Sequence, residues 1–178
     1  MSKVQLAKEI ARRAHKGQVD KAGVDYIQHP LRVHRNLRSN PTFKSLSEQD
    51  RDDCEVGALL HDVIEDSGQN GGERFGKQEL IEIGFTPNSI HLVELLTRPK
   101  SNPNCDDYYL RINENLCAKL IKWADIADNR NVYRVTDLTM DQDLMLTAKY
   151  DHALSLIPFA NSEEHDWFEE AKRYNLEV

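Results

Sequence analysis

Residues 58–66 read ALLHDVIED, an apolar run that ends in ionisable side chains. In a continuous helix of about 100° per residue, the leucines, the valine and the isoleucine share one face. The ionisable residues form two i,i+4 pairs over an arc of roughly 140° on the opposite side, namely His61, Asp62, Glu65 and Asp66. Grouping these side chains on an apolar helix costs free energy unless a cation accompanies them. A solvated helix face is the alternative, but four apolar residues before His61 favour a buried approach.

The remaining sequence is patterned as helix almost throughout, with no convincing period-2 strand and no internal repeat. Loops are expected at 16–29 and in the glycine-rich segment 67–76. The expected helices cover the N-terminus to about residue 15, 30 to about 39, 47 to about 65, 77–83, 88–97, 106–113, 115 to about 132, 141–157 and 163–174. We therefore predict an all-α fold, a single compact multi-helix domain over 1–178. Its motif-bearing core spans about 7–131, and C-terminal helices span about 141–174.

Composition narrows the class of protein. No stretch approaches the roughly 18 consecutive apolar residues of a membrane helix. The charged N-terminus is unlike a signal peptide, so a cytoplasmic protein without a membrane partner is expected. The net charge of −7 disfavours binding to long nucleic acids, whose phosphates need a basic field. A small phosphorylated ligand remains compatible, because a metal and a few local cations can dominate a pocket.

The three cysteines are far apart and include no CxxC pair. An odd number of cysteines without a secretory signal indicates a reducing compartment. We therefore expect Cys54, Cys105 and Cys117 not to form disulfides.

Two further segments place polar side chains against apolar surroundings. YIQHP (26–30) sets His29 at a loop-to-helix junction, where a turn can aim its imidazole inward. A capping or surface histidine is the alternative. KLIKWADIADN (119–129) places Asp125 and Asn129 at i,i+4 on an otherwise apolar helix. Here the alternative is an acid at the solvent edge.

Taken together, these segments resemble a known family. The order H…HD…D is similar to that of the HD superfamily. The fuller run AHKGQVDKAG-x-x-YIQHP, ALLHDVIED, LTR and KLIKWADIADN resembles the hydrolase half of RelA/SpoT enzymes and the small alarmone hydrolases, over roughly residues 7–131. The resemblance implies an HD-domain bundle that hydrolyses a phosphorylated nucleotide with a metal. The first candidate substrate is guanosine 3′,5′-bis(diphosphate), cleaved at its 3′-pyrophosphate.

The resemblance also implies site residues. One divalent metal would be held by His29, His61, Asp62 and Asp125. Two imidazoles and two carboxylates suit Mn²⁺, with iron, cobalt or another divalent ion as alternatives. A six-coordinate ion with these four ligands keeps positions for water and a phosphate oxygen.

Other residues match the family's catalytic and substrate positions. Glu65 and Asp66 are similar to its acidic pair, which would orient the attacking water or carry its proton. Alternatively, the pair only steers His61 and the metal. Expected substrate contacts come from Lys21, Asn129 and Arg98, with weaker candidates at Tyr108 and Tyr109.

The sequence departs from the pattern at three positions. Asp20 stands where the alarmone hydrolases usually have arginine, Asp25 where they have proline, and Arg130 lies one place early. In an exposed loop, Asp20 would reverse the local charge and weaken alarmone binding. An HD nucleotidase or phosphatase acting on another phosphoester is therefore a second hypothesis, and a non-catalytic metal or nucleotide sensor is a third. The sequence pattern does not predict an oligomeric state.

Overall fold

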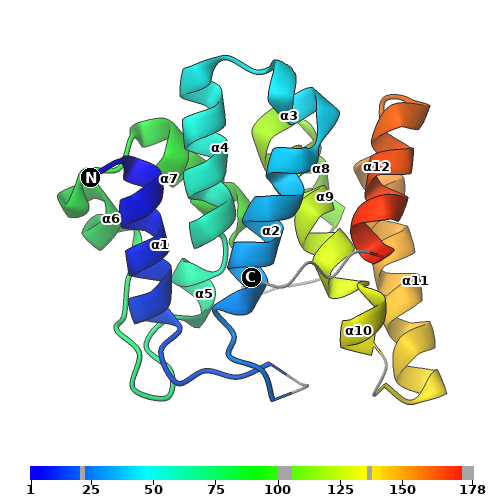
Figure 1. Ribbon diagram of the computed structural model, residues 1–178, viewed down its shortest axis with the longest axis horizontal. Helices are drawn as coiled ribbons and strands as arrows, with labels where there is room; N and C mark the ends of the chain where they lie inside the picture. Colours follow the sequence, from blue (N-terminus) through cyan, green and yellow to red (C-terminus); the bar gives the residue numbers. More distant parts are fainter. Residues whose placement is uncertain (21–22, 100–105, 136–137, 174–178) are drawn as a thin grey trace.

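The computed structural model describes residues 1–20, 23–99, 106–135 and 138–173, and within these ranges it is helical (Figure 1). The helices are α1 (Lys3–Ala14), α2 (Gln28–Ser39), α3 (Pro41–Ser45), α4 (Glu48–Leu60), α5 (Val63–Asp66), α6 (Lys77–Ile83), α7 (Pro87–Leu96), α8 (Asp106–Asn113), α9 (Leu116–Asn129), α10 (Val132–Val135), α11 (Met140–Leu156) and α12 (Ser162–Arg173). The only extended pairing in the described ranges is an isolated antiparallel bridge between Val19 and Asp25. The predicted all-α fold is confirmed.

Helix α4 is central to the arrangement, because it packs against α1, α2, α7 and α9. It also contributes to both hydrophobic clusters of the core. Cys54 and Ala58 belong to the cluster shared with α2, α8, α9 and α12, whereas Leu59 and Leu60 belong to the cluster shared with α1, α6 and α7. Its C-terminal end therefore delivers the next residue, His61, into the interior of the bundle.

Capping side chains begin several of the helices. Ser47 starts α4 by accepting a hydrogen bond from the backbone N–H of Asp50 at 3.1 Å. Asn40 ends α2 and caps α3, since its side chain accepts from the N–H of Phe43 at 3.0 Å. The predicted end of this helix at about residue 39 is present, but it is followed by the short helix α3, which the sequence did not predict.

The predicted continuous helix from 47 to about 65 is wrong. Helix α4 ends at Leu60, and α5 begins at Val63 after a turn at His61 and Asp62. The Nδ1 atom of His61 lies 2.8 Å from the carbonyl oxygen of Ala58, which in an unbroken α-helix would accept from the N–H of residue 62. The ionisable residues of 61–66 therefore do not share one regular helix face.

A disulfide joins Cys54 of α4 to Cys117 of α9, with 5.6 Å between their Cα atoms. The expectation that these two cysteines stay unpaired is wrong. They are 63 residues apart and meet only because α4 packs on α9, which their number and spacing cannot reveal. Cys105 lies outside the described residues.

Reduction of this disulfide should lower the melting temperature. In the chain-entropy model, opening a loop of 63 residues lowers the free energy of unfolding by about 4 kcal/mol, or roughly 10 °C for a domain of this size. Thermal unfolding with and without reductant measures the shift. Cys117→Ser should abolish the sensitivity to reductant, and Cys105→Ser should leave it intact. Identical melting curves for oxidised and reduced protein would contradict the crosslink.

Among the described helices, none has both the length and the apolar character needed to cross a membrane.

Candidate metal centre

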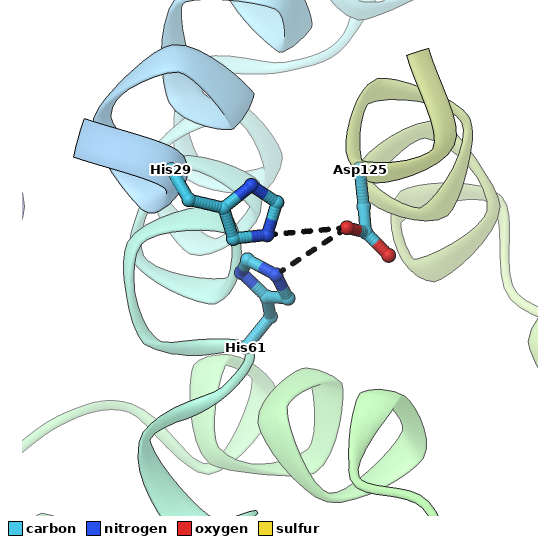
Figure 2. A group of neighbouring side chains, drawn as sticks. All are labelled: His29, His61 and Asp125. Atoms are coloured by element: carbon cyan, nitrogen blue, oxygen red, sulfur yellow. Dashed lines mark ion pairs between the residues drawn. The ribbon is translucent and has the colours of Figure 1, made fainter. Parts of the chain in front are cut away.

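Three helices bring together three of the four predicted metal ligands. His29 lies in the first turn of α2, His61 directly follows α4, and Asp125 lies in α9. Each offers one ligand atom, and these atoms lie within 4.8 Å of one another (Figure 2). All three residues are buried. Such a group, distant in sequence and converging in the interior, has the chemistry of a metal site.

Asp62, the fourth predicted ligand, lies at the edge of this group. Its Oδ2 atom is 3.1 Å from Nε2 of His61 and 3.5 Å from Nε2 of His29. The same oxygen accepts a hydrogen bond from the Tyr26 hydroxyl at 2.6 Å. Tyr26 was not singled out in the sequence, although it lies one helical turn before His29. The role of Asp62 as a ligand stays a prediction.

The position of the hydrogen on the His61 ring leaves one nitrogen able to bind a cation. Its Nδ1 contacts the Ala58 carbonyl oxygen, which can only accept, so Nδ1 carries the hydrogen and Nε2 presents a lone pair. That Nε2 atom is buried and makes no hydrogen bond within the described part of the chain. A buried polar nitrogen without a hydrogen bond costs free energy, and a divalent metal between His29, His61 and Asp125 would remove that cost by binding to it.

Electrostatics also favour a cation here. Burial raises the pKa of Asp125, but Lys122 and His29 outweigh that effect and hold it well below its usual range. Burial lowers the pKa of His29, whereas hydrogen bonds to Asp125 and Asp128 raise it to about 9. A proton on His29 thus balances the carboxylates in the absence of metal, and metal binding would displace it.

Both oxygens of Asp125 are held in place. The buried ammonium of Lys122 donates to Oδ2 at 2.7 Å, and the side-chain amide of Asn129 donates to Oδ1 at 2.5 Å. Lys122 was missed in the sequence, although its i,i+3 spacing to Asp125 on an apolar helix was an available signal. Because Oδ1 also lies 3.3 Å from Nε2 of His29, this clamp directs the carboxylate at the imidazoles.

The acidic pair on α5 is half-buried. Oε2 of Glu65 accepts a hydrogen bond from the backbone N–H of Arg98 at 3.0 Å. Burial raises the pKa of Glu65 and of Asp66, and the negative charge of Asp62 raises both further. The guanidinium of Arg98 points elsewhere, over the ring of Tyr108 at 5.3 Å. The structure therefore places the backbone N–H of Arg98 in contact with Glu65, while the charge of the Arg98 side chain also acts to lower the pKa of Glu65.

A pocket of about 950 Å³ opens beside the metal group. It is lined by Val19, Asp20, Tyr26, Tyr109, Asn129, Arg134, Val135, Leu138, Gln142, Met145, Leu146, Ala148, Lys149, Tyr150 and His152. Tyr26 and Asn129 connect it to the metal group, since they are hydrogen-bonded to Asp62 and Asp125. Tyr109 lines the pocket, whereas Tyr108 is core and Arg98 is not among the lining residues. Lys21 lies outside the described residues.

Asp20 was expected to be exposed, but only 8% of its side chain is accessible. Its Oδ1 accepts from the N–H of Val24 at 3.0 Å, which folds the loop back on itself. Its Oδ2 lies 3.7 Å from Nη2 of Arg134, a residue that the sequence did not single out. The negative charge of Asp20 is thus offset by a neighbouring cation, and the expected penalty on a phosphorylated ligand shrinks.

Comparison with known proteins identifies the family. The HD domain model matches residues 26–130, so the chain belongs to the HD-domain family. No curated protein sequence matches the chain. It is similar to a solved structure described as "A metazoan ortholog of SpoT hydrolyzes ppGpp and plays a role in starvation responses", with a TM-score of 0.74, 21% identity and coverage of 96% of this chain and 94% of that one. At this identity the likeness shows the fold.

Family and site together define a metal-dependent phosphohydrolase of the HD type. The predicted membership of the HD family is confirmed, and the solved structure of the SpoT ortholog shares the predicted fold.

Proposed function

We propose that this protein hydrolyses a phosphorylated nucleotide, with the 3′-pyrophosphate of guanosine 3′,5′-bis(diphosphate) as the first candidate. The observation that carries the proposal is the buried group of His29, His61 and Asp125 beside a pocket of about 950 Å³. Pockets of roughly 300–1,000 Å³ are typical of small-molecule sites, and a nucleotide falls within that range. The solved structure with the same fold is described as hydrolysing ppGpp, which supports the choice of first substrate.

In this proposal His29, His61, Asp62 and Asp125 hold one divalent metal, Mn²⁺ first and iron or cobalt as alternatives. When bound, such an ion supplies an acidified water and polarises a phosphoryl group. Glu65 and Asp66 orient the attacking water and accept its proton at a carboxylate oxygen. The substrate contacts assigned to Asn129, Lys21 and Arg98 stay predictions.

The pocket residues refine the substrate contacts. Asn129 and Arg134 both line the pocket, and Nη1 of Arg134 lies 3.1 Å from Oδ1 of Asn129. This pair would face a phosphate that enters beside Asp125.

The cytoplasm stays the compartment proposed from sequence, although a disulfide is more common in oxidising compartments.

A second candidate, hydrolysis of another phosphoester, is favoured by Asp20. Its carboxylate lies 3.7 Å from Nη2 of Arg134 and offsets part of the positive charge that this residue offers to additional phosphates. A ligand with fewer phosphates than an alarmone would then suffice to fill the pocket.

A substrate screen tests the proposal. Protein loaded with Mn²⁺ should convert guanosine 3′,5′-bis(diphosphate) and water into GDP and pyrophosphate, and a chelator should stop the reaction. GTP, GDP and nucleoside monophosphates serve as competing substrates, with products separated by ion-exchange chromatography. Turnover of those nucleotides alone would exclude the alarmone. Binding without any turnover would show a sensor and contradict the enzymatic proposal.

A further inference from the structure

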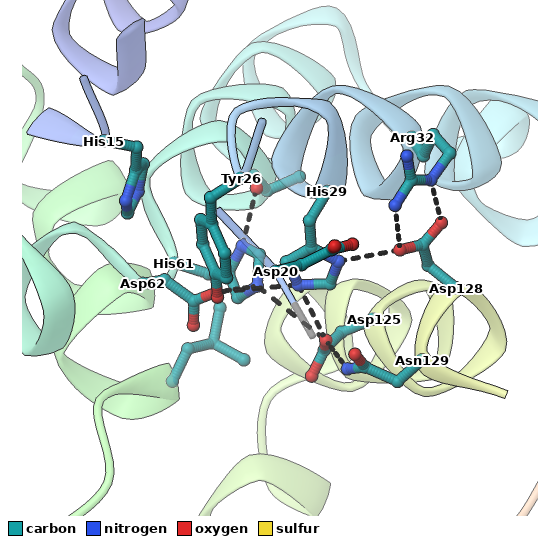
Figure 3. Close-up of polar contacts among 12 residues, drawn as sticks. His15, Asp20, Tyr26, His29, Arg32, His61, Asp62, Asp125, Asp128 and Asn129 are labelled. Carbon is teal, nitrogen blue, oxygen red and sulfur yellow. Dashed lines mark hydrogen bonds and ion pairs between the residues drawn. The ribbon is translucent and has the colours of Figure 1, made fainter. Parts of the chain in front are cut away.

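Asp128 lies one turn beyond Asp125 on α9 and is not one of the predicted metal ligands. Its side chain is 1% accessible, yet its carboxylate carries four polar contacts. Figure 3 shows those with Arg32 and His29. Arg32 donates from Nε to Oδ1 at 2.6 Å and from Nη2 to Oδ2 at 3.1 Å. Arg134 donates from Nη1 to Oδ2 at 2.6 Å. The fourth contact joins Oδ2 to Nδ1 of His29 at 2.7 Å.

These contacts fix the direction of the hydrogen bond with His29. The guanidinium groups of Arg32 and Arg134 both contact the carboxylate of Asp128, an arrangement that favours its ionised form. An ionised carboxylate only accepts, so Nδ1–H of His29 donates to Asp128. Nη1 of Arg134 also lies 3.0 Å from Nδ1, a contact that would need the other tautomer. The shorter, charge-assisted contact with the carboxylate decides between them.

In the neutral imidazole that metal binding requires, the hydrogen is on Nδ1 and the lone pair of His29 is on Nε2. That atom lies 3.3 Å from Oδ1 of Asp125, on the side of the ring that faces the metal group. His61 reaches the same state differently, because its Nδ1 contacts a backbone carbonyl. A side-chain substitution can therefore remove the support of His29 without touching that of His61.

We propose that Asp128 is a positioning residue of the metal centre, whose carboxylate fixes the ring and tautomer of His29 and raises its basicity as a ligand. The proposal rests on the metal centre of the proposed function. Arg32 lies on α2, three residues after His29, and its two hydrogen bonds tie Asp128 to the helix that carries this histidine. Hydrogen-bonded partners of this kind commonly alter metal affinity by about 10–100-fold.

Metal affinity tests this directly. Metal-free protein is titrated with Mn²⁺, and free Mn²⁺ is followed by electron paramagnetic resonance. Asp128→Asn keeps the shape of the side chain and removes its charge, and it should weaken Mn²⁺ binding by about 10-fold or more. An unchanged dissociation constant in folded Asp128→Asn protein would overturn the proposal.

Asp53→Asn is the matched control. Asp53 is another buried aspartate, which accepts from the Thr86 hydroxyl at 2.5 Å and the Ser89 hydroxyl at 2.6 Å. It precedes His61 by eight residues, about 12 Å along α4. This variant should lose stability and bind Mn²⁺ as tightly as the parent. Equal weakening in both variants would assign the effect to general destabilisation and sink the proposal.

A second measurement needs no variant. In protein loaded with diamagnetic Zn²⁺, nitrogen-15 NMR of the imidazoles should show the hydrogen of His29 on Nδ1, in a hydrogen bond, and the metal on Nε2. Metal on Nδ1 of His29 would overturn the proposal even if Asp128→Asn failed to fold. Neither measurement involves turnover, so an inactive protein that binds metal still tests Asp128. A parent protein that binds no divalent metal would instead refute the proposed function.

Discussion

The His61→Ala protein should lose its divalent metal and, with it, roughly 10³-fold of turnover, because Lewis-acid stabilisation worth several kcal/mol disappears. His61 is buried, and its Nε2 makes no hydrogen bond within the described residues, so the substitution removes a metal ligand without breaking a hydrogen bond at that atom. Elemental analysis of the purified variant and anomalous scattering at the metal edge measure the loss. Full metal occupancy in His61→Ala would refute the assigned site.

His34→Ala is the matched control for this experiment. His34 is also buried on the helix that carries His29, but its Nε2 lies 2.6 Å from Glu55, outside the metal group. That variant should retain metal while losing stability. A further control uses mass action, since a chelator should lower the melting temperature of the parent protein and leave that of His61→Ala unchanged.

Glu65→Gln and Asp66→Asn should keep the metal and each lose roughly 10²-fold or more in kcat, as expected when a general base is removed. Neither carboxylate belongs to the group formed by His29, His61 and Asp125. In Glu65→Gln, the side-chain carbonyl oxygen can still accept the hydrogen bond that the Arg98 N–H gives to Glu65, so the local structure should survive. Steady-state kinetics together with metal content separate a chemical role from a structural one.

The pKa shifts of this acidic pair give the direction of the pH dependence. Burial raises the pKa of Glu65 and Asp66, so each carboxylate is protonated, and unable to act as a base, up to a higher pH than an ordinary acid. The acidic limb of the kcat profile should therefore lie above the usual carboxylate range, and activity should fall as the pH drops through it. Glu73→Gln, which changes an exposed acid paired with Arg13, should leave kcat unchanged. Parent-like turnover in both acidic-pair variants would make the pair structural.

Much of the architecture could be predicted because it is encoded locally. Helical patterning located α6 and α8 at their observed bounds, and the helix expected from residue 47 located the start of α4 at Glu48. Likewise, His29, His61 and Asp125 lie on elements whose ends or buried faces were already visible as patterns. Such local sequence preferences predict the structure correctly where the tertiary packing favours the same conformation.

The rest depends on contacts between distant segments, which periodicity does not report. The Cys54–Cys117 disulfide needs α4 to pack on α9, and the offset of Asp20 by Arg134 needs a loop to meet α10. Asp128 was not singled out in the sequence, yet it serves three partners from two other helices. The end of α4 at Leu60 was missed because the apolar pattern continues through Val63.

That break in the helix decides how His61 and Asp62 can cooperate. Consecutive residues of an unbroken helix project about 100° apart, too divergent for neighbours to share one small ion. At the break, Asp62 adopts φ −97° and ψ −5°, a bridge-region conformation found at many active sites. Its Oδ2 thereby comes within 3.1 Å of the neighbouring Nε2. In the proposed metal centre, His61 and Asp62 would therefore chelate one ion in a geometry set by the backbone, and the second donor would add little entropic cost once the first had bound.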